Sequence, residues 1–181
     1  MLDKLGENTL IKLLEEMGTQ QLTSRLYNAI APRLALTAIE TVILRRRNGK
    51  CEILLARRSS DDAYYQNQWH SPGTMLRASD VDPETETGFR VPEYDGFKKA
   101  FDRLTKGELG VKFKCPPVQI KSLFHLTPRG PEVALIFLCE IKGEPLNGKF
   151  FDIKELPKNL IDHHYRIIDT VKEFLEKSNL Y

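Results

Sequence analysis

Apolar positions recur at helical spacing near the amino terminus, and the change to strand-like composition after residue 34 predicts the order of the elements. Four apolar residues near the amino terminus recur at helical spacing: Leu10, Leu13, Leu14 and Met17. Gly18 follows them as a stop, and Thr23 or Ser24 can cap a second helix that ends before Pro32. The pattern therefore predicts two helices, a helical hairpin, at the start of the chain.

From residue 34 onward the chain becomes rich in Ile, Val and Thr, which is typical of strands. Residues 34–44 and 51–57 are predicted strands, and Asn48-Gly49 between them is a strong turn motif. These segments predict a β-hairpin. A polar loop follows at residues 59–68, and residues 75–77 can form a short strand.

Residues 78–94 are acidic, contain prolines and lack apolar periodicity, so we expect a surface loop long enough to act as a lid. A helix is predicted next, because four residues share one apolar face: Phe97, Ala100, Phe101 and Leu104. Gly107 and Gly110 bracket its end.

The remaining chain predicts three strands and a final helix, at residues 118–125, 132–141, 150–153 and 162–177. Strands on both sides of a central helix, with another helix at the end, indicate an α/β fold with a mixed sheet packed between helices. We predict a helical extension over residues 1–33 and one α/β domain over residues 34–181. The extension can cover a sheet edge, form part of a substrate pocket or serve as a homodimer contact.

Composition narrows the class of protein. A chain of 181 residues with 41% hydrophobic residues can bury a core without metal or disulfide staples. Its three cysteines are far apart and have no metal-ligand spacing, so we expect reduced thiols. No apolar run is long enough for a membrane span and the amino terminus lacks the pattern of a signal peptide, so we expect a cytoplasmic protein.

The charge pattern argues against nucleic acid as the partner. The net charge is only +2, and the arginine cluster at residues 45–47 leads directly into Asn48-Gly49. A solvated hairpin tip is the preferred interpretation of that cluster.

The segment between residues 54 and 111 carries the candidate chemistry. Its motifs are a strand ending in Arg57-Arg58, then Trp69 and Pro72-Gly73, and a helix that contains Arg103, Glu108, Gly110 and Val111. This order resembles the Nudix hydrolases, whose signature helix carries carboxylates that hold a divalent metal against a substrate pyrophosphate. Mg²⁺ prefers oxygen ligands, and carboxylates one turn apart on a helix share a face. The resemblance implies a Nudix fold, an α/β/α sandwich, and hydrolysis that depends on Mg²⁺ or Mn²⁺.

Several signature positions are altered. Leu104 replaces the Glu after Arg103, Gly107 replaces the first Glu of a Glu-Glu pair, Asp95 stands near the early Glu, and Thr74 occupies the signature Gly position. Residues 100–110 resemble the altered signature of GDP-mannose mannosyl hydrolases, which keep only the last Glu as a metal ligand. Those enzymes release GDP and a free sugar.

By this resemblance, Glu108 is both the metal carboxylate and a catalytic residue. Arg103 contacts the phosphates or orients Glu108, and a carbonyl near Gly73 completes the metal shell together with Asp95. His125 is a candidate general base, because an ordinary histidine pKa of about 6.5 suits that role. The substrate-binding candidates are Arg58, Glu40, Trp69 and Arg77.

Each candidate also has a purely structural interpretation. Glu108 can be a solvated helix-end carboxylate, Arg103 an ion-pair partner, and Arg58 a strand-end charge. Trp69 and His125 can be packing residues. His163 and His164, at the start of the last predicted helix, are interpreted as capping or surface residues.

Two functional hypotheses remain. The first is a Nudix-type hydrolase of a nucleoside diphosphate linked to another moiety, such as a nucleotide sugar. The second is a Nudix-fold binding module without catalysis, which explains Leu104 and Gly107 directly, because a single carboxylate binds metal weakly unless substrate phosphates complete the shell. An RNA-related role is a third and weaker idea, which the arginine cluster permits but does not support.

Overall fold

A computed structural model describes residues 4–17, 22–80 and 97–178. Within these residues the strands form a seven-stranded mixed sheet with the order β3-β2-β1-β7-β6, while β4 also pairs with β1 and β9 with β2. The strands of this sheet are β1 (Leu36–Arg47), β2 (Lys50–Arg57), β3 (Trp69–His70), β4 (Gly73–Met75), β6 (Val118–Thr127), β7 (Gly130–Cys139) and β9 (Lys149–Asp152). A separate pair joins β5 (Lys112–Phe113) to β8 (Ile141–Lys142).

Strand β1 is the centre of the sheet, because it pairs with three other strands. It runs parallel to β7 from Leu36 to Ile43 and antiparallel to β2 from Leu44 to Arg47. The β1–β2 turn has Asn48 and Gly49 at φ 50° and 73°, the left-handed values that a tight hairpin turn requires. The predicted β-hairpin is therefore confirmed.

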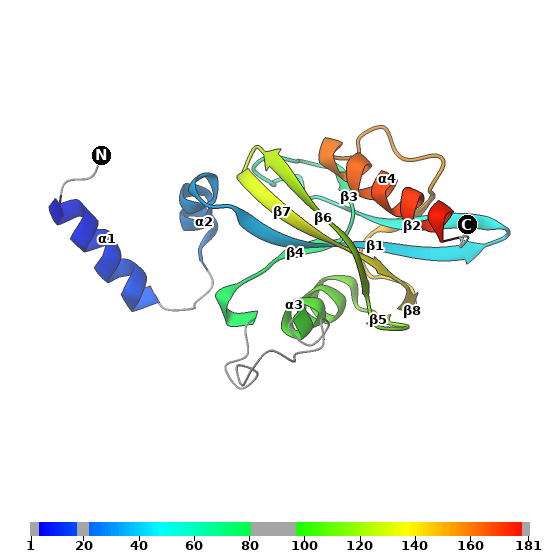
Figure 1. Cartoon of the computed structure of the whole chain (residues 1–181), viewed down its shortest axis with the longest axis horizontal. Coiled ribbons are helices and arrows are strands. Elements are labelled where there is room, and N and C mark those ends of the chain that lie inside the picture. The colour runs from blue at the N-terminus through cyan, green and yellow to red at the C-terminus, as the bar shows by residue number, and fades with distance from the viewer. Residues whose placement is uncertain (1–3, 18–21, 81–96, 179–181) are drawn as a thin grey trace.

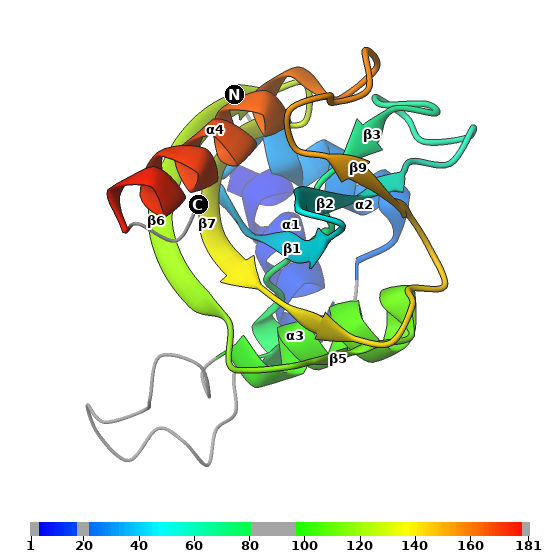
Figure 2. The same ribbon diagram turned by 90° about the vertical axis from the view of Figure 1, so that its right-hand side faces the viewer.

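Helices cover both faces of the sheet (Figures 1 and 2). Helix α4 (Asp162–Lys177) packs Ile167, Ile168 and Val171 against one face, where Val42 and Ile136 are fully buried. Helix α3 (Lys98–Asp102) and the π-helical turn η5 (Arg103–Leu109) pack against the other face. The predicted α/β class, with a mixed sheet between helices, is confirmed.

The helix predicted from the signature segment is present, but it widens into a π-helix from Arg103 onward. Phe101 and Leu104 are almost completely buried there and pack with Phe137 of β7. The segment ends at Gly110, whose φ of 66° lies in the left-handed region. Leu104 thus belongs to the core.

The amino-terminal segment forms α1 (Lys4–Met17), α2 (Ser24–Ile30) and a short 3-10 turn, η1 (Ala31–Arg33). Thr23 caps α2 by accepting a hydrogen bond from the Leu26 amide, as predicted. Ala31 is buried beside the β6–β7 turn, where a Cβ on Gly130 would lie 2.7 Å from the Ala31 carbonyl oxygen. Helix α1 has no buried residue and stands apart from the domain in Figure 1.

Most element predictions agree with the structure, and the differences are local. The final helix has the predicted bounds. The short strand expected at residues 75–77 instead lies at Gly73–Met75, because it pairs with Ala38–Glu40 of β1. The predicted strand 132–141 is divided into β7 and β8. The loop predicted over residues 78–94 begins with a 3-10 turn, η2 (Ala78–Asp80), and its remainder lies outside the described residues.

The three cysteines are free thiols, as expected: Cys139 is buried, Cys51 is half-buried and Cys115 is exposed. No helix in the described ranges is long and apolar enough to cross a membrane.

Two glycines of the signature segment make a matched test of the packing. Gly110→Ala should lower the free energy of unfolding by about 1 kcal/mol or more, because alanine is strained at positive φ. Its Cβ would also lie 2.5 Å from Leu146 Cδ1. Gly107→Ala should raise stability by about 0.5–1 kcal/mol, since its Cβ would meet open space within a helix. Urea denaturation measures both, and equal effects of the two variants would contradict this packing.

Candidate functional site

A cleft of about 250 Å³ opens where β2 ends, beside η5. Its lining comes from four separate segments and consists of Ala56, Arg57, Arg58, Ser59, Asp62, His70, Pro72, Glu108, Leu109 and Asn147. Two predicted site residues that are distant in sequence, Arg58 and Glu108, therefore meet in one cleft.

Arg58 supplies a cation with few partners of its own. Its backbone amide donates to the Gln68 carbonyl, which fixes the end of β2. Its Nε is buried without a hydrogen-bond partner, and its nearest carboxylate oxygen, on Asp62, is 3.9 Å away. Asp62 is itself held by the backbone amides of Tyr64 and Tyr65. The Arg58 guanidinium is thus available to an anionic ligand.

Glu108 lies at the rim of this cleft. The surrounding chain removes water from its carboxyl and raises its pKa above the ordinary value. The guanidiniums of Arg58, Arg103 and Arg77 act in the opposite direction. Glu108 thus lies within the positive field of three arginines, in a cleft that Asp62 also lines.

Arg103 is occupied by the chain itself. Its guanidinium forms an ion pair with Asp80 and donates to the Met75 carbonyl oxygen at 2.9 Å and to Thr74 Oγ1 at 3.3 Å. These bonds tie the signature helix to β4 and η2. Arg103 acts on Glu108 only through its charge, and Thr74, at the signature Gly position, accepts its hydrogen bonds.

Gly73 faces Glu40 across the β1–β4 pair. A Cβ on Gly73 would lie 2.5 Å from Glu40 Oε2 and 2.7 Å from the Ile39 carbonyl oxygen. Only glycine fits at this position. The preceding carbonyl, of Pro72, accepts from the amide and hydroxyl of Thr41 at 2.9 and 2.6 Å.

All four histidines of the chain gather next to the cleft, on the α4 face of the sheet. We call His70, His125, His163 and His164 the histidine cluster; their ring centroids are 5.8 Å apart for His70–His164, 4.5 Å for His163–His164 and 5.3 Å for His125–His163. His164 Nδ1 accepts a hydrogen bond of 3.2 Å from the Ser71 amide. His70, which lines the cleft, connects the cluster to it.

Burial keeps these imidazoles neutral. It lowers the pKa of His70 to about 3 and of His163 to about 4, and it holds the pKa of His164 well below its ordinary value. The interpretation of His163 and His164 as capping or surface residues is wrong for His164, which is only 1% exposed. His164 lies one turn before the buried Ile168 on α4, so the helical spacing of the apolar residues could have predicted that His164 is buried.

Glu40 is the second buried acid of the site. Burial, aided by the negative charge of Glu132, raises its pKa to about 8 against the opposing charges of Arg58 and Arg129. Its Oε2 lies 3.9 Å from His164 Nδ1, too far for a hydrogen bond, and has no other partner. At neutral pH Glu40 is therefore a protonated acid beside a neutral imidazole.

Unpartnered polar atoms accumulate around this pair. Among the described residues, the buried side-chain atoms without a hydrogen-bond partner are Tyr27 OH, Glu40 Oε2, Arg58 Nε, Tyr65 OH, Ser71 Oγ, His125 Nε2, Arg129 Nε, Glu132 Oε1 and His163 Nε2. The charges of Arg58 and Arg129 act on Tyr27, Tyr65, Glu40 and His163, so these atoms share one region. Buried polar atoms rarely stay unpaired, so this region is built to receive water or a polar ligand.

The other sequence candidates lie elsewhere. Trp69 packs edge-on against Phe151 at 5.0 Å and does not line the cleft. His125 is buried on β6 at the far end of the histidine cluster. Arg77 is close enough to lower the pKa of Glu108. Asp95 lies outside the described residues.

The cleft contains residues that the sequence did not single out as site residues. Asn147 and Asp62 lie in loops, and no local pattern marks them. Glu132, which belongs to the buried polar region and does not line the cleft, carried a clearer signal, because it is a single acid at the start of an otherwise apolar strand and is 1% exposed. Its carboxylate accepts from Arg129 at 3.0 Å, which explains how a charge is tolerated there.

The donor set does not fit a divalent metal held by the protein alone. Within residues 4–17, 22–80 and 97–178, no group of three or more His, Cys, Asp or Glu side chains is placed to bind one ion. Leu104 is fully buried, and Gly107 contributes no side chain. At the altered signature positions Glu108 is the remaining carboxylate, and it would need further oxygen ligands to hold a divalent ion.

Comparison with solved structures identifies the fold. A MutT Nudix hydrolase from Burkholderia pseudomallei is similar, with a TM-score of 0.55 and 21% identity over 77% of this chain and 99% of that one. The Nudix domain of Shewanella oneidensis NrtR, solved with ADP ribose, has a TM-score of 0.56 and 16% identity over 85% and 99% of the two chains. The Ap4A hydrolase of C. elegans has a TM-score of 0.51 and 18% identity over 78% and 99%.

At these identities the likeness establishes the Nudix fold, as the resemblance in the sequence implied. No protein-family model matches the sequence, and no curated protein is similar to it.

The neutral state of Glu40 leads to a prediction about stability and pH. Between about pH 4.5 and about pH 8 the unfolded carboxyl ionises while the folded one stays protonated, so the unfolding free energy falls as pH rises. Glu40→Gln lacks this loss, and the variant should gain stability over the parent by several kcal/mol between pH 5 and pH 8.

Urea denaturation at both pH values measures the gain. Glu140→Gln, which removes an exposed carboxylate paired with Lys114, is the control and should follow the parent profile. Parallel profiles for parent and Glu40→Gln would show that Glu40 ionises normally.

Proposed function

We propose that this chain is a Nudix-type hydrolase whose substrate is a nucleoside diphosphate linked to a second group, a nucleotide sugar in the first instance. The observation that carries the proposal is the meeting of Glu108 and Arg58 in one cleft. The altered signature at residues 100–110, with its resemblance to GDP-mannose mannosyl hydrolases, supports the sugar.

Arg58 binds the diphosphate. Its unpartnered Nε and its distance from Asp62 leave the guanidinium free to form charge-assisted bonds with phosphate oxygens. Arg57 and Asn147 line the same cleft and add polar contacts. Arg103, fixed to Asp80, contributes positive potential and holds η5 in place.

Glu108 accepts the proton of the attacking water. Its raised pKa brings the carboxylate closer to the value that suits a general base near neutral pH. The positive charges of Arg58 and Arg77 compensate for charge that develops on the departing phosphate. Glu108 would be the protein carboxylate for a Mg²⁺ or Mn²⁺ ion, which would neutralise charge on the diphosphate.

The buried polar region beyond His70 receives the part of the substrate that is not phosphate. Glu40, as a neutral acid, can donate and accept a hydrogen bond, and Ser71 and Glu132 offer further unpartnered oxygens. Hydroxyl groups of a sugar match such a mixed set of partners. The ADP ribose bound to the Shewanella domain, a nucleoside diphosphate joined to a sugar, supports this class of ligand.

A second candidate is ligand binding without turnover. It is favoured by the burial of Leu104 and by the lack, in the described part of the chain, of a carboxylate group large enough to hold a metal. Under this alternative Arg58 still binds a diphosphate, but Glu108 has no chemical role. Turnover and binding therefore have to be measured separately.

The first experiment compares turnover of nucleoside diphosphate sugars, dinucleotides and capped RNA, with Mg²⁺ or Mn²⁺, by the parent and Glu108→Gln. We expect hydrolysis of a nucleoside diphosphate sugar, and a fall in kcat of about 100-fold or more in the variant because the base is lost. Glu140→Gln is the matched control. No turnover of any substrate by the parent excludes the hydrolase, and turnover that Glu108→Gln leaves unchanged excludes this site.

Binding is measured by calorimetry with a nucleoside diphosphate in the presence of a chelator, so that no hydrolysis occurs. Arg58→Ala should weaken binding about 10-fold or more, since a charge-assisted hydrogen bond is lost. Arg47→Ala, at the exposed hairpin tip, should bind like the parent. Equal losses in the two variants would indicate general electrostatic attraction and would remove Arg58 from the site. Binding with no turnover by the parent would select the second candidate.

A further inference from the structure

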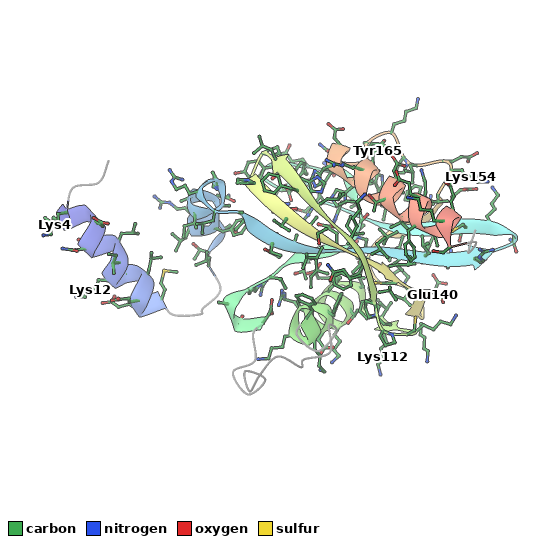
Figure 3. All side chains as sticks on the ribbon, in the orientation of Figure 1. Lys4, Lys12, Lys112, Glu140, Lys154 and Tyr165 are labelled. Atoms are coloured by element: carbon green, nitrogen blue, oxygen red, sulfur yellow. The ribbon has the colours of Figure 1, made fainter. Side chains whose placement is uncertain are left out.

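Helix α1 presents an apolar surface that nothing in the described chain covers. Its large apolar side chains are exposed by 76% at Leu5, 45% at Leu10, 48% at Ile11, 52% at Leu13 and 43% at Leu14. Leu10, Leu13, Leu14 and Met17 recur at helical spacing and form one stripe, which we call the α1 stripe. In Figure 3 the helix, marked by Lys4 and Lys12, stands clear of the domain.

An exposed amphipathic helix of this kind requires a partner surface. Isolated helices of this length are only marginally stable in water, and most helical stability in proteins comes from packing an apolar face. Because no residue of α1 is buried, its own domain does not supply that packing here.

The sheet has a second uncovered apolar surface. Phe124 and Leu126 alternate on β6 and are exposed by 61% and 84%. They lie opposite Val133 and Pro131 of β7, and we call these four residues the β6–β7 patch. The patch is on the α3 side of the sheet, since Leu123, the residue before Phe124 on β6, packs against the α4 side and successive strand residues point to opposite faces.

The β6–β7 patch is exposed because α3 is too short to cover it. Phe97 and Phe101 cover Phe137 near the other end of β7, with ring centroids 5.8 and 5.0 Å away. Val133 precedes Phe137 by four residues on β7, and Phe124 of β6 pairs with Val133. Both residues therefore lie beyond the part of the sheet that α3 covers. Strand β6, which carries Phe124 and Leu126, is an edge of the sheet, so another chain can reach it.

We propose that the α1 stripe of one copy packs on the β6–β7 patch of a second copy, and that the chain forms a homodimer by reciprocal exchange of α1. Two surfaces of matching character then cover each other, and both contacts repeat about a two-fold axis. Pairing of two α1 helices alone would leave both patches exposed.

Interface size also favours the exchange. Helix α1 has 14 residues and is about 21 Å long. The area that one helix of this length buries is small compared with the roughly 1,200 Å² that stable interfaces bury, whereas exchange makes two such contacts. The turn η1 fixes the base of each arm, because the Ala31 carbonyl packs against Gly130 at the end of the patch-bearing strands.

The oligomeric state of the full chain tests this inference independently of any activity. Light scattering after size exclusion should give a dimer for the parent and a monomer for Leu10→Lys with Leu13→Lys, in which lysine preserves helix propensity. Phe124→Lys, on the other surface, should also give a monomer. Glu15→Lys on the polar side of α1 and Leu146→Lys, an 86% exposed leucine elsewhere, should stay dimeric. Circular dichroism confirms that each variant is folded.

Cysteine pairing distinguishes exchange from packing within one chain. In a Cys115→Ser background, a chain carrying Leu13→Cys is mixed with one carrying Phe124→Cys and oxidised. A covalent dimer of the two chains is expected. A monomeric parent, or a dimer that survives either lysine variant, overturns the proposal. A chain carrying both cysteines that closes a disulfide only within itself also overturns it.

Discussion

The close approach of Gly73 to Glu40 is the constraint on which the site depends. Without a side chain at Gly73, β4 can pair with β1 while the Glu40 carboxyl occupies the space where a Cβ would stand. This pairing carries the chain past Pro72, whose carbonyl is held by Thr41, and places the Pro72 ring in the cleft. The same closeness excludes water from Glu40, and its neutral state follows from that exclusion.

A neutral Glu40 changes the electrostatics around Arg58. If Glu40 and Glu132 were both ionised, Arg58 and Arg129 would each have a buried carboxylate as counter-charge. Instead Glu132 pairs with Arg129 at 3.0 Å, and Arg58 keeps only a distant Asp62. The protonation of one buried acid therefore leaves Arg58 without a buried carboxylate as counter-charge, and the diphosphate proposed above would place negative charge beside it.

The sequence predicted the fold well because local sequence patterns mark most of its helices and strands. Runs rich in Ile, Val and Thr predicted β1 and β2, and Asn48-Gly49 predicted the turn that joins them. Arg58 and Glu108 were singled out by the resemblance to the Nudix signature and not by these local patterns. The local patterns could not show which elements lie next to one another in the fold.

The residues that escaped prediction are those whose role is set by tertiary contacts. Arg103 matches the signature, yet its partner Asp80 lies in a turn with no motif of its own. The four histidines are spread from residue 70 to residue 164, and only the folding of β3, β6 and α4 onto one another brings their rings together. Trp69 has the chemistry of a ligand platform, but its place in the sheet commits it to Phe151.

The two altered signature positions differ in their physical cause. Leu104 is fully buried among Phe101, Leu109 and Phe137, so a carboxylate there would lose its hydration without gaining a partner. Core packing therefore explains why position 104 has no carboxylate. At Gly107 a side chain would meet open space, so nothing in the fold prevents a second carboxylate beside Glu108. Core packing therefore accounts for Leu104 but not for Gly107. If the cleft binds a phosphate as proposed, an added carboxylate at Gly107 would compete with that phosphate for the same arginines.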